Sequence, residues 1–377
     1  MNIAIDARYV ADHFPGIGRY VYNLISALAE LDQSHRLIVI HNPALLNSRY
    51  DMPTLARLPN AELIAVSAPP FSLAEHVRLP VLLRQIRADV YHAPYYVRPY
   101  VALPCPTVTT LYDAIPRLFP AEVSLRARLL FDVLTRLAVH NSQRLLAISE
   151  SARADLIGAY AIEPERIAVT PLAADARFRP QSAAAIDALR TRYRLRARYV
   201  LTLAANKPHK NLPLLIAAWA QLIRTPGFPP DFVLVVAGHW DPRFPAARHA
   251  VERLRLGDRV RFLPNVADAD LPALYAGATV FVFPSRYEGF GLPPLEALAC
   301  GAPVLCGNVS SLPEVVGAAA LKVDMNSVDE LARGLAQLLH DGALRRSLAE
   351  AGPIQAARFS WRQAAGATLA VYEAAVC

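Results

Sequence analysis

Short apolar runs alternate with amphipathic segments along most of the chain. The run Asn2–Ala7 is of strand type, and in Gly18–Leu31 the apolar residues recur at the three- and four-residue spacing of a helix. The same two patterns continue, with strands predicted at 35–42, 62–68, 88–94, 107–113 and 144–150 and helices at 73–86 and 124–142. Strands that alternate with helices form parallel sheets, so the pattern predicts an α/β fold.

The pattern restarts after a segment typical of a linker, Phe178–Ile186, which combines proline, polar and small residues. Beyond it we predict strands at 199–205, 231–238, 260–266, 279–285 and 302–308 and helices at 211–223, 271–278 and 293–301. We therefore expect two Rossmann-like domains, residues 1–177 and 178–358, that face each other across a cleft. A C-terminal helix in 359–377 is expected to pack back on the first domain. Ligands of such sheets bind at the carboxyl ends of the strands.

Length and composition agree with this organisation, since 377 residues with 54% hydrophobic content suffice for two cores. The N-terminus lacks the basic and apolar regions of a signal peptide, and no apolar run reaches the roughly 18 residues of a membrane span. We therefore expect a cytoplasmic protein. Four cysteines, Cys105, Cys300, Cys306 and Cys377, lack the spacing of metal ligands, so free thiols and no metal are expected.

The net charge of +7 falls on residues 177–377, because residues 1–176 contain 16 basic and 16 acidic residues. A basic half can attract nucleic acid, anionic lipid or a phosphorylated small molecule. Its most basic segment, Leu189–Tyr199, is interpreted as a solvated helix end and loop. No nucleic-acid-binding motif accompanies it, so no nucleic-acid partner is expected.

The segment "SRYEGFGLPPLEALACGAPV" (Ser285–Val304) carries two carboxylates around a glycine turn. Glu288 follows the predicted strand 279–285, and the turn leads into a helix that we expect to carry Glu296 in its first turn. A helix N-terminus suits a diphosphate, and carboxylates on either side of it can accept hydrogen bonds from sugar and ribose hydroxyls. The pattern therefore favours a nucleotide-sugar site. An ordinary helix start with an acidic residue is the alternative, and it explains Glu296 alone.

Several segments, taken in order, resemble the retaining glycosyltransferases of family 4, which have the GT-B fold. They are "DARYVADHFPGIGRYVYNL", "LAISESARADL", "IAVTPLAADARFRP", "NKPHKNLPLLIAAW", "EGFGLPPLE", "SSLPEVVG" and "FSWRQAAGATLAVYE". Together they extend over nearly the whole chain, and they are most similar to a mannosyltransferase-like subgroup.

The resemblance implies roles for individual positions. Glu288 would bond donor-sugar hydroxyls, Glu296 the ribose, and Lys210 would neutralise the diphosphate. The catalytic set it implies is Glu288, Lys210, Asp113 and Tyr112. The donor-binding set is Gly16, Gly18, Lys210, Val266, Glu288, Gly289, Phe290, Gly291, Leu292 and Glu296. Gly16 and Gly18 would form a loop over the phosphates, and Val266 lies in a segment whose backbone reads the nucleobase.

Three positions depart from the family pattern. Tyr112 stands where the family often has a histidine that reaches the donor's 6-hydroxyl; a tyrosine titrates near pH 10. His209 replaces an arginine and is expected to titrate near neutral pH. Alanines at 204 and 205 replace a further arginine of some members, so Arg286 is a candidate for additional phosphate neutralisation.

The acceptor candidates are Arg19 and Tyr20, which flank the glycines together with Asp12 and His13, and His92, which follows a predicted strand. A hydrogen-bonded structural histidine is the alternative for His92.

The resemblance implies a retaining, metal-independent hexosyltransferase that needs no cofactor. GDP-mannose is the expected donor, with a glycan or lipid-linked acceptor in surface polysaccharide (lipopolysaccharide) synthesis. Alternatives are GDP-rhamnose or UDP-glucose as donor, and a non-catalytic nucleotide-sugar-binding subunit. A lipid-linked acceptor would require peripheral association with the inner face of the membrane. The apolar and basic helix predicted within 124–142 could supply its contact surface, although a core-facing helix is the alternative.

Overall fold

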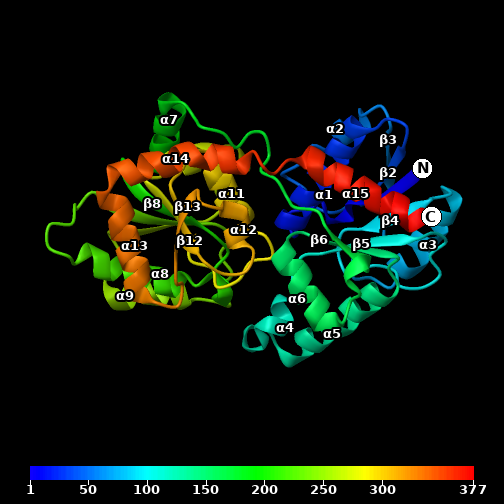
Figure 1. Cartoon of the computed structure of the whole chain (residues 1–377), viewed down its shortest axis with the longest axis horizontal. Helices are drawn as coiled ribbons and strands as arrows, with labels where there is room; N and C mark the ends of the chain where they lie inside the picture. The colour runs from blue at the N-terminus through cyan, green and yellow to red at the C-terminus, as the bar shows by residue number, and fades with distance from the viewer. The chain divides into compact units, whose positions relative to one another are not determined.

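Two parallel β-sheets organise the chain, one in each of two units (Figure 1). The computed structural model describes residues 1–377. The first unit comprises Met1–Leu172 and Ser360–Cys377, and the second comprises Ala173–Phe359. The first change of unit therefore falls after Leu172, a few residues before the boundary expected at 177.

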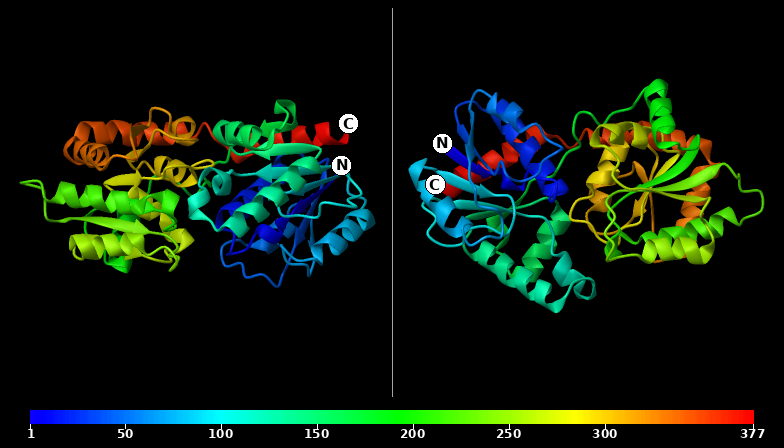
Figure 2. Two further views of the ribbon diagram at one scale, coloured as in Figure 1. Left: turned by 90° about the horizontal axis from the view of Figure 1, so that it is seen from below. Right: turned by 180° about the vertical axis from the view of Figure 1, so that it is seen from behind.

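The sheet of the first unit has seven strands in the order β3-β2-β1-β4-β5-β6-β7. Its strands are β1 (Asn2–Asp6), β2 (Arg36–His41), β3 (Ala61–Ala65), β4 (Val90–Ala93), β5 (Thr107–Leu111), β6 (Arg144–Ala147) and β7 (Ile167–Val169). The helical segments are η1 (Ala7–Tyr9), α1 (Pro15–Leu31), α2 (Met52–Ala56), α3 (Glu75–Gln85), α4 (Ile115–Leu118), η2 (Pro120–Glu122), α5 (Leu125–His140), α6 (Glu150–Tyr160), η3 (Pro164–Arg166) and α15 (Trp361–Val376). Helices cover both faces of this sheet (Figure 2).

The last helix of the chain, α15, belongs to the first unit and lies beside α1 (Figure 1). Its Tyr372 side chain is fully buried, and the Tyr372 hydroxyl lies 2.6 Å from Nδ1 of His92 on β4. A segment from the end of the sequence therefore completes the core around strands from its beginning.

The sheet of the second unit has six strands in the order β10-β9-β8-β11-β12-β13. Its strands are β8 (Arg198–Leu203), β9 (Phe232–Ala237), β10 (Val260–Leu263), β11 (Val280–Phe283), β12 (Val304–Gly307) and β13 (Ala320–Val323). The helical segments are α7 (Ala183–Tyr193), η4 (Pro208–Lys210), α8 (Leu212–Ile223), α9 (Ala246–Leu254), η5 (Asp268–Asp270), α10 (Leu271–Ala276), α11 (Leu292–Ala299), α12 (Leu312–Val316), α13 (Val328–His340) and α14 (Gly342–Ala356).

Two sequence predictions for this unit were wrong in detail. Strand 231–238 was predicted to lead directly into strand 260–266, but α9 lies between them, as parallel neighbours require a crossover connection. The linker predicted at Phe178–Ile186 ends earlier, because α7 begins at Ala183. The Ser182 hydroxyl accepts a hydrogen bond from the Ala185 N–H and caps this helix.

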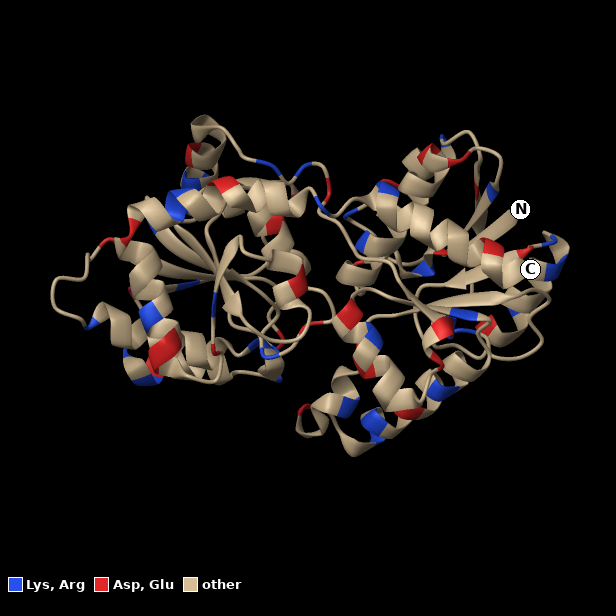
Figure 3. Ribbon diagram, in the orientation of Figure 1, with Lys and Arg blue, Asp and Glu red and all other residues tan.

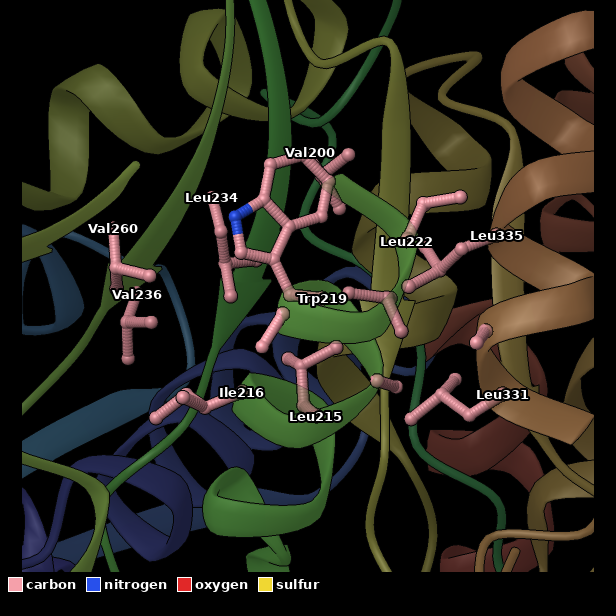
Figure 4. Packing of buried hydrophobic residues seen from close by; sticks show 14 of the residues in the cluster. Val200, Leu215, Ile216, Trp219, Leu222, Leu234, Val236, Val260, Leu331 and Leu335 are labelled. Atoms are coloured by element: carbon pink, nitrogen blue, oxygen red, sulfur yellow. The ribbon is translucent and has the colours of Figure 1, made fainter. Parts of the chain in front are cut away.

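The core of the second unit is built around Trp219 of α8, which is fully buried (Figure 4). The same apolar cluster contains Val200 of β8, Leu234 of β9 and Leu335 of α13. The Trp219 indole N–H donates to the backbone oxygen of Arg259 at 2.9 Å, so this polar group has a hydrogen-bond partner although it is buried. Strands such as β9 are buried along their whole length, as strands with helices on both faces must be.

None of the helices combines the length and the apolarity that a crossing of the bilayer requires.

Candidate functional site

In the second unit, β8 and β11 are central neighbours whose connections leave in opposite directions. The chain passes from β8 to β9 on one side, while β11 leads to β12 on the other. The carboxyl ends of two such strands flank a crevice where ligands of α/β sheets bind. Lys210 follows β8 and Glu288 follows β11, so both side chains come from this edge.

Lys210 and Glu288 form an ion pair in which Nζ and Oε1 are 2.5 Å apart. The two side chains are only 18% and 11% exposed, so water screens their attraction weakly. The Lys210 ammonium also lies 5.7 Å from the ring centre of Phe283. The sequence implied a role for each residue separately, whereas their contact joins positions too far apart for any local pattern to indicate.

The loop that carries Lys210 is held by its neighbour Asn211, which adopts a left-handed φ of 57°. The Asn211 side-chain amide donates to the backbone oxygen of Met325 at 2.7 Å. Arg286 links this loop to the one after β11: its backbone N–H donates to the His209 oxygen at 2.9 Å, and its guanidinium donates to Asn211 Oδ1 at 3.3 Å. The Arg286 residue itself is exposed, next to the loops that carry Lys210 and Glu288.

His209 is buried, which corrects the expectation that it titrates near neutral pH. Burial, together with the charges of Lys210 and Lys207, lowers the pKa of His209 to about 3. The imidazole is therefore neutral at pH 7 and adds no positive charge to the site.

Two serines after β12 hold the turn that follows Glu288. The Glu288 N–H donates to Ser310 Oγ at 3.0 Å. The Ser311 hydroxyl lies 2.9 Å from the oxygen of Glu288 and 2.7 Å from the oxygen of Phe290, so its proton is shared between them. Both serines lie in the "SSLPEVVG" segment, but neither was predicted as a site residue, because they act on the turn's backbone.

Gly291 ends the turn with a φ of 103°, where a Cβ atom would lie 2.7 Å from Leu312 Cδ2. Only glycine satisfies both the conformation and the space. The next helix, α11, begins with Leu292 and continues with two prolines, which have no N–H group. The free donors at this helix start are therefore the backbone N–H groups of Phe290, Gly291 and Leu292, which have no acceptor within the chain.

Glu296 lies in the second turn of α11, since the helix begins at Leu292; the expectation of a first-turn position was wrong. Its side chain is nearly fully buried, and Oε2 accepts a hydrogen bond of 3.0 Å from the Tyr275 hydroxyl. Tyr275 of α10 therefore fixes the direction of this carboxylate. Val266 belongs to the loop after β10 at the same edge of the sheet, next to Asn265 with its left-handed φ of 61°.

In the first unit, Gly16 and Gly18 lie inside the first turn of α1 rather than in a loop, because the helix begins at Pro15. A Cβ atom on Gly18 would approach the backbone oxygen of Tyr9 to 3.1 Å, so close packing of α1 accounts for this glycine. Gly16 has open space around its Cα atom.

Tyr112 follows β5, and its hydroxyl is buried without a hydrogen-bond partner. Its ring lies edge-on to that of Tyr20, with 5.8 Å between centres. Burial, reinforced by Tyr20 and Tyr95, raises the pKa of Tyr112 well above its usual value, so the phenol does not titrate near pH 10 as expected. Asp113 Oδ1 accepts a hydrogen bond of 2.9 Å from the Ile115 N–H at the start of α4.

The acceptor candidates Tyr20 and His92 are buried, and Arg19 is only 8% exposed. His92 Nε2 lies 2.8 Å from the hydroxyl of Thr110, which also lies 3.0 Å from the Tyr20 hydroxyl. Burial lowers the pKa of His92 to about 3. These contacts fit the structural alternative for His92, and the Tyr20 hydroxyl is likewise bonded within the core.

Comparison with known proteins gives matches over both units. Residues 15–178 match the family described as Glycosyltransferase Family 4, and residues 190–355 match Glycosyl transferases group 1. The O-antigen chain mannosyltransferase B of Escherichia coli is 31% identical over 372 residues, which cover 95% of this chain and 96% of that protein.

Solved structures agree in fold. Sucrose-phosphate synthase from Thermosynechococcus elongatus aligns with a TM-score of 0.77 at 21% identity, over 99% of this chain and 98% of that one. WaaG, a glycosyltransferase involved in lipopolysaccharide biosynthesis, aligns with a TM-score of 0.72 at 21% identity, over 98% of each chain.

Two Rossmann-like units of this kind define the GT-B fold, and with the sequence matches they make the protein a glycosyltransferase. The chain belongs to glycosyltransferase family 4.

Proposed function

We propose that the protein transfers mannose from GDP-mannose to a glycan or lipid-linked acceptor in surface polysaccharide synthesis, with retention of the anomeric configuration. The observation that carries the proposal is the Lys210–Glu288 pair at the central edge of the second sheet, beside a turn with free N–H groups. The choice of mannose is supported by the mannosyltransferase to which the chain is similar over nearly its whole length.

The second unit would bind the donor through its diphosphate. Charge develops on a departing nucleoside diphosphate, so fixed donors at that position stabilise the transition state. Lys210, the nearby guanidinium of Arg286 and the N–H groups of Phe290, Gly291 and Leu292 supply such donors. These groups would replace a metal ion, and we propose a reaction that needs neither metal nor cofactor.

Glu288 would accept hydrogen bonds from sugar hydroxyls while it orients Lys210. Glu296, held by Tyr275, would accept from the ribose, so Glu296→Ala should mainly raise the donor KM. Val266 and its neighbours would face the nucleobase. In the first unit, Gly16, with open space around its Cα atom, and Asp113 remain predictions for the same reaction. The resemblance assigns no general base, and none is proposed.

The test is incubation of purified protein with GDP-mannose and an acceptor extract, with and without EDTA, followed by NMR of the product's anomeric proton. An α-linked mannoside formed equally well in EDTA supports the proposal. An inverted product, or a requirement for a metal ion, contradicts the corresponding part of it. A thermal-shift comparison of GDP-mannose, GDP-rhamnose and UDP-glucose tests the donor, and donor binding without hydrolysis or transfer would indicate the non-catalytic alternative.

A further inference from the structure

Large apolar side chains that remain exposed to solvent are concentrated in the first unit. Only Ile354 among them belongs to the second unit. The helix α5 alone carries five, which are Leu125, Leu129, Leu130, Val133 and Leu137, exposed by 61, 56, 55, 53 and 38%. Contiguous exposed apolar surface of this kind marks a site of interaction.

These five side chains share one side of the helix, which we call the outer face of α5. At 100° per residue, their positions fall within about 140° of the helix circumference. The opposite side buries Phe131, Thr135 and Ala138 in the first unit. The core-facing alternative considered from the sequence therefore accounts for the inner side only, and the side chains of the outer face remain 38 to 61% exposed.

Basic residues accompany the outer face. Arg126 and Arg136 lie between its apolar positions, and both are exposed. The acidic residue of the helix, Asp132, lies at the margin, where Arg117 and Arg136 bond its two oxygens at 2.8 and 3.0 Å. Basic positions drawn in blue recur along this helix in Figure 3. The outer face therefore carries basic side chains among its apolar ones, and the carboxylate at its margin is paired with arginines.

We infer that the outer face of α5 docks on an anionic lipid surface. Its leucines would enter the boundary between headgroups and acyl chains, while the long arginine side chains keep their charges at the headgroup level. Cationic residues near a leaflet of anionic lipids add attraction that an apolar ridge alone lacks. The same charges disfavour a second copy of this chain as the occupant, because two cationic faces repel each other.

The inference locates the membrane contact that a lipid-linked acceptor of the proposed function would require, and it is tested without donor or acceptor. The experiment is co-sedimentation with vesicles of phosphatidylcholine, with and without phosphatidylglycerol. We expect binding to the anionic vesicles, weaker binding to the neutral ones and a decrease with rising salt. Leu129→Gln combined with Val133→Gln should weaken binding at least tenfold, and Arg126→Gln should remove most of the preference for anionic lipid.

The matched control is Val77→Gln combined with Val81→Gln on α3, a pair with the same spacing and 66 and 45% exposure. It should bind as the parent does, and thermal unfolding should be unchanged in every variant because all these side chains are exposed. The inference is overturned by no binding to anionic vesicles, by an α5 variant that binds as the parent does, or by an equal loss in the control. It is also overturned if Leu129→Gln with Val133→Gln dissociates a dimer in sedimentation velocity. Donor hydrolysis by the α5 variants should equal that of the parent, so a failure here leaves the proposed function standing.

Discussion

At the scale of single residues, the site depends on a few charges in partly buried positions. Lys210 and Glu288 neutralise each other in the structure, and His209 is uncharged beside them. A diphosphate would therefore meet three kinds of donor. They are the Lys210 ammonium, which Glu288 already orients, the exposed guanidinium of Arg286 and backbone N–H groups. Changes to these charges should alter catalysis far more than stability.

We expect Glu288→Gln to lower kcat/KM by ~30- to 150-fold, equivalent to ~2–3 kcal/mol of transition-state stabilisation. The substitution keeps the size of the side chain but removes its negative charge and one of its two acceptor oxygens, which weakens both the bonds to sugar hydroxyls and the pairing with Lys210. The measurement is steady-state transfer with the preferred donor. The control is Asp231→Asn, which removes the carboxylate of an exposed pair with Arg198 and should leave the rate unchanged. Transfer by Glu288→Gln at the parent rate would contradict the site.

Tyr112→Phe tests whether the unpartnered Tyr112 hydroxyl serves the donor. Loss of a buried hydroxyl that has no partner should leave stability unchanged or raise it slightly. If the hydroxyl bonds the sugar's O6, kcat/KM for GDP-mannose should fall about tenfold, while GDP-rhamnose, which has a methyl group at C6, should be used equally well. Tyr20→Phe is the structural control, because it removes a bonded hydroxyl and should cost ~1 kcal/mol of stability. Equal losses for both donors would show that Tyr112 does not sense C6.

At the scale of elements, the turn between β11 and α11 depends on backbone geometry. Its shape is set by Gly291 at positive φ and by the hydroxyls of Ser310 and Ser311. Five helices elsewhere begin after a serine whose hydroxyl accepts a backbone N–H, namely α5, α6, α7, α13 and α15. In α11 the cap is glycine instead, so its first N–H groups remain available to a ligand.

Gly291→Ala should therefore destabilise the second unit by at least ~1 kcal/mol and weaken donor binding, because the new methyl group meets both an unfavourable φ and Leu312. Thermal unfolding with and without GDP measures both effects. Gly158→Ala in α6 is the control, since its Cα faces open space and alanine favours helix; it should stabilise by ~0.5–1 kcal/mol. If Gly291→Ala were as stable as the parent and bound GDP equally well, the turn would not need its glycine.

Much of this element-scale description could be predicted from the sequence. The strands were predicted because runs such as Val280–Phe283 are apolar throughout, and the glycine turn because it follows one of them. The helix α9 was missed, since "AARHAVERL" is short and mostly exposed. The exposure of α5 could not be predicted, because periodicity shows that a helix has an apolar side but not how many of its sides are covered.

At the scale of the whole molecule, acid should weaken both units. His92 in the first unit and His209 in the second have pKa values lowered to about 3 from 6.5, because burial disfavours the charged imidazole. The unfolded chain takes up protons below pH 6.5 while the folded chain does not. The free energy of unfolding should therefore be highest above pH 6.5 and fall as the pH drops toward 3, by up to ~1.4 kcal/mol per pH unit for each histidine.

Urea denaturation at pH 7.5 and pH 5 measures this dependence. His92→Gln should reduce the loss between the two pH values, even if the variant is less stable at both. His249→Gln, at an exposed position, should behave as the parent does. A pH dependence unchanged by His92→Gln would mean that this imidazole takes up protons equally in the folded and the unfolded chain.

The position of α15 in the first unit also determines the order in which the two units can complete folding during synthesis. The second unit, Ala173–Phe359, is one uninterrupted segment, whereas the first is completed only by Ser360–Cys377. Domains generally fold as units while the ribosome delivers them from the N-terminus. Here the unit whose synthesis begins first is finished after the other, because Tyr372, the partner of His92, is translated after the whole of the second unit. A nascent chain that stalls within α15 would present an intact second unit beside an open first one, which is the form that chaperones and proteases would meet.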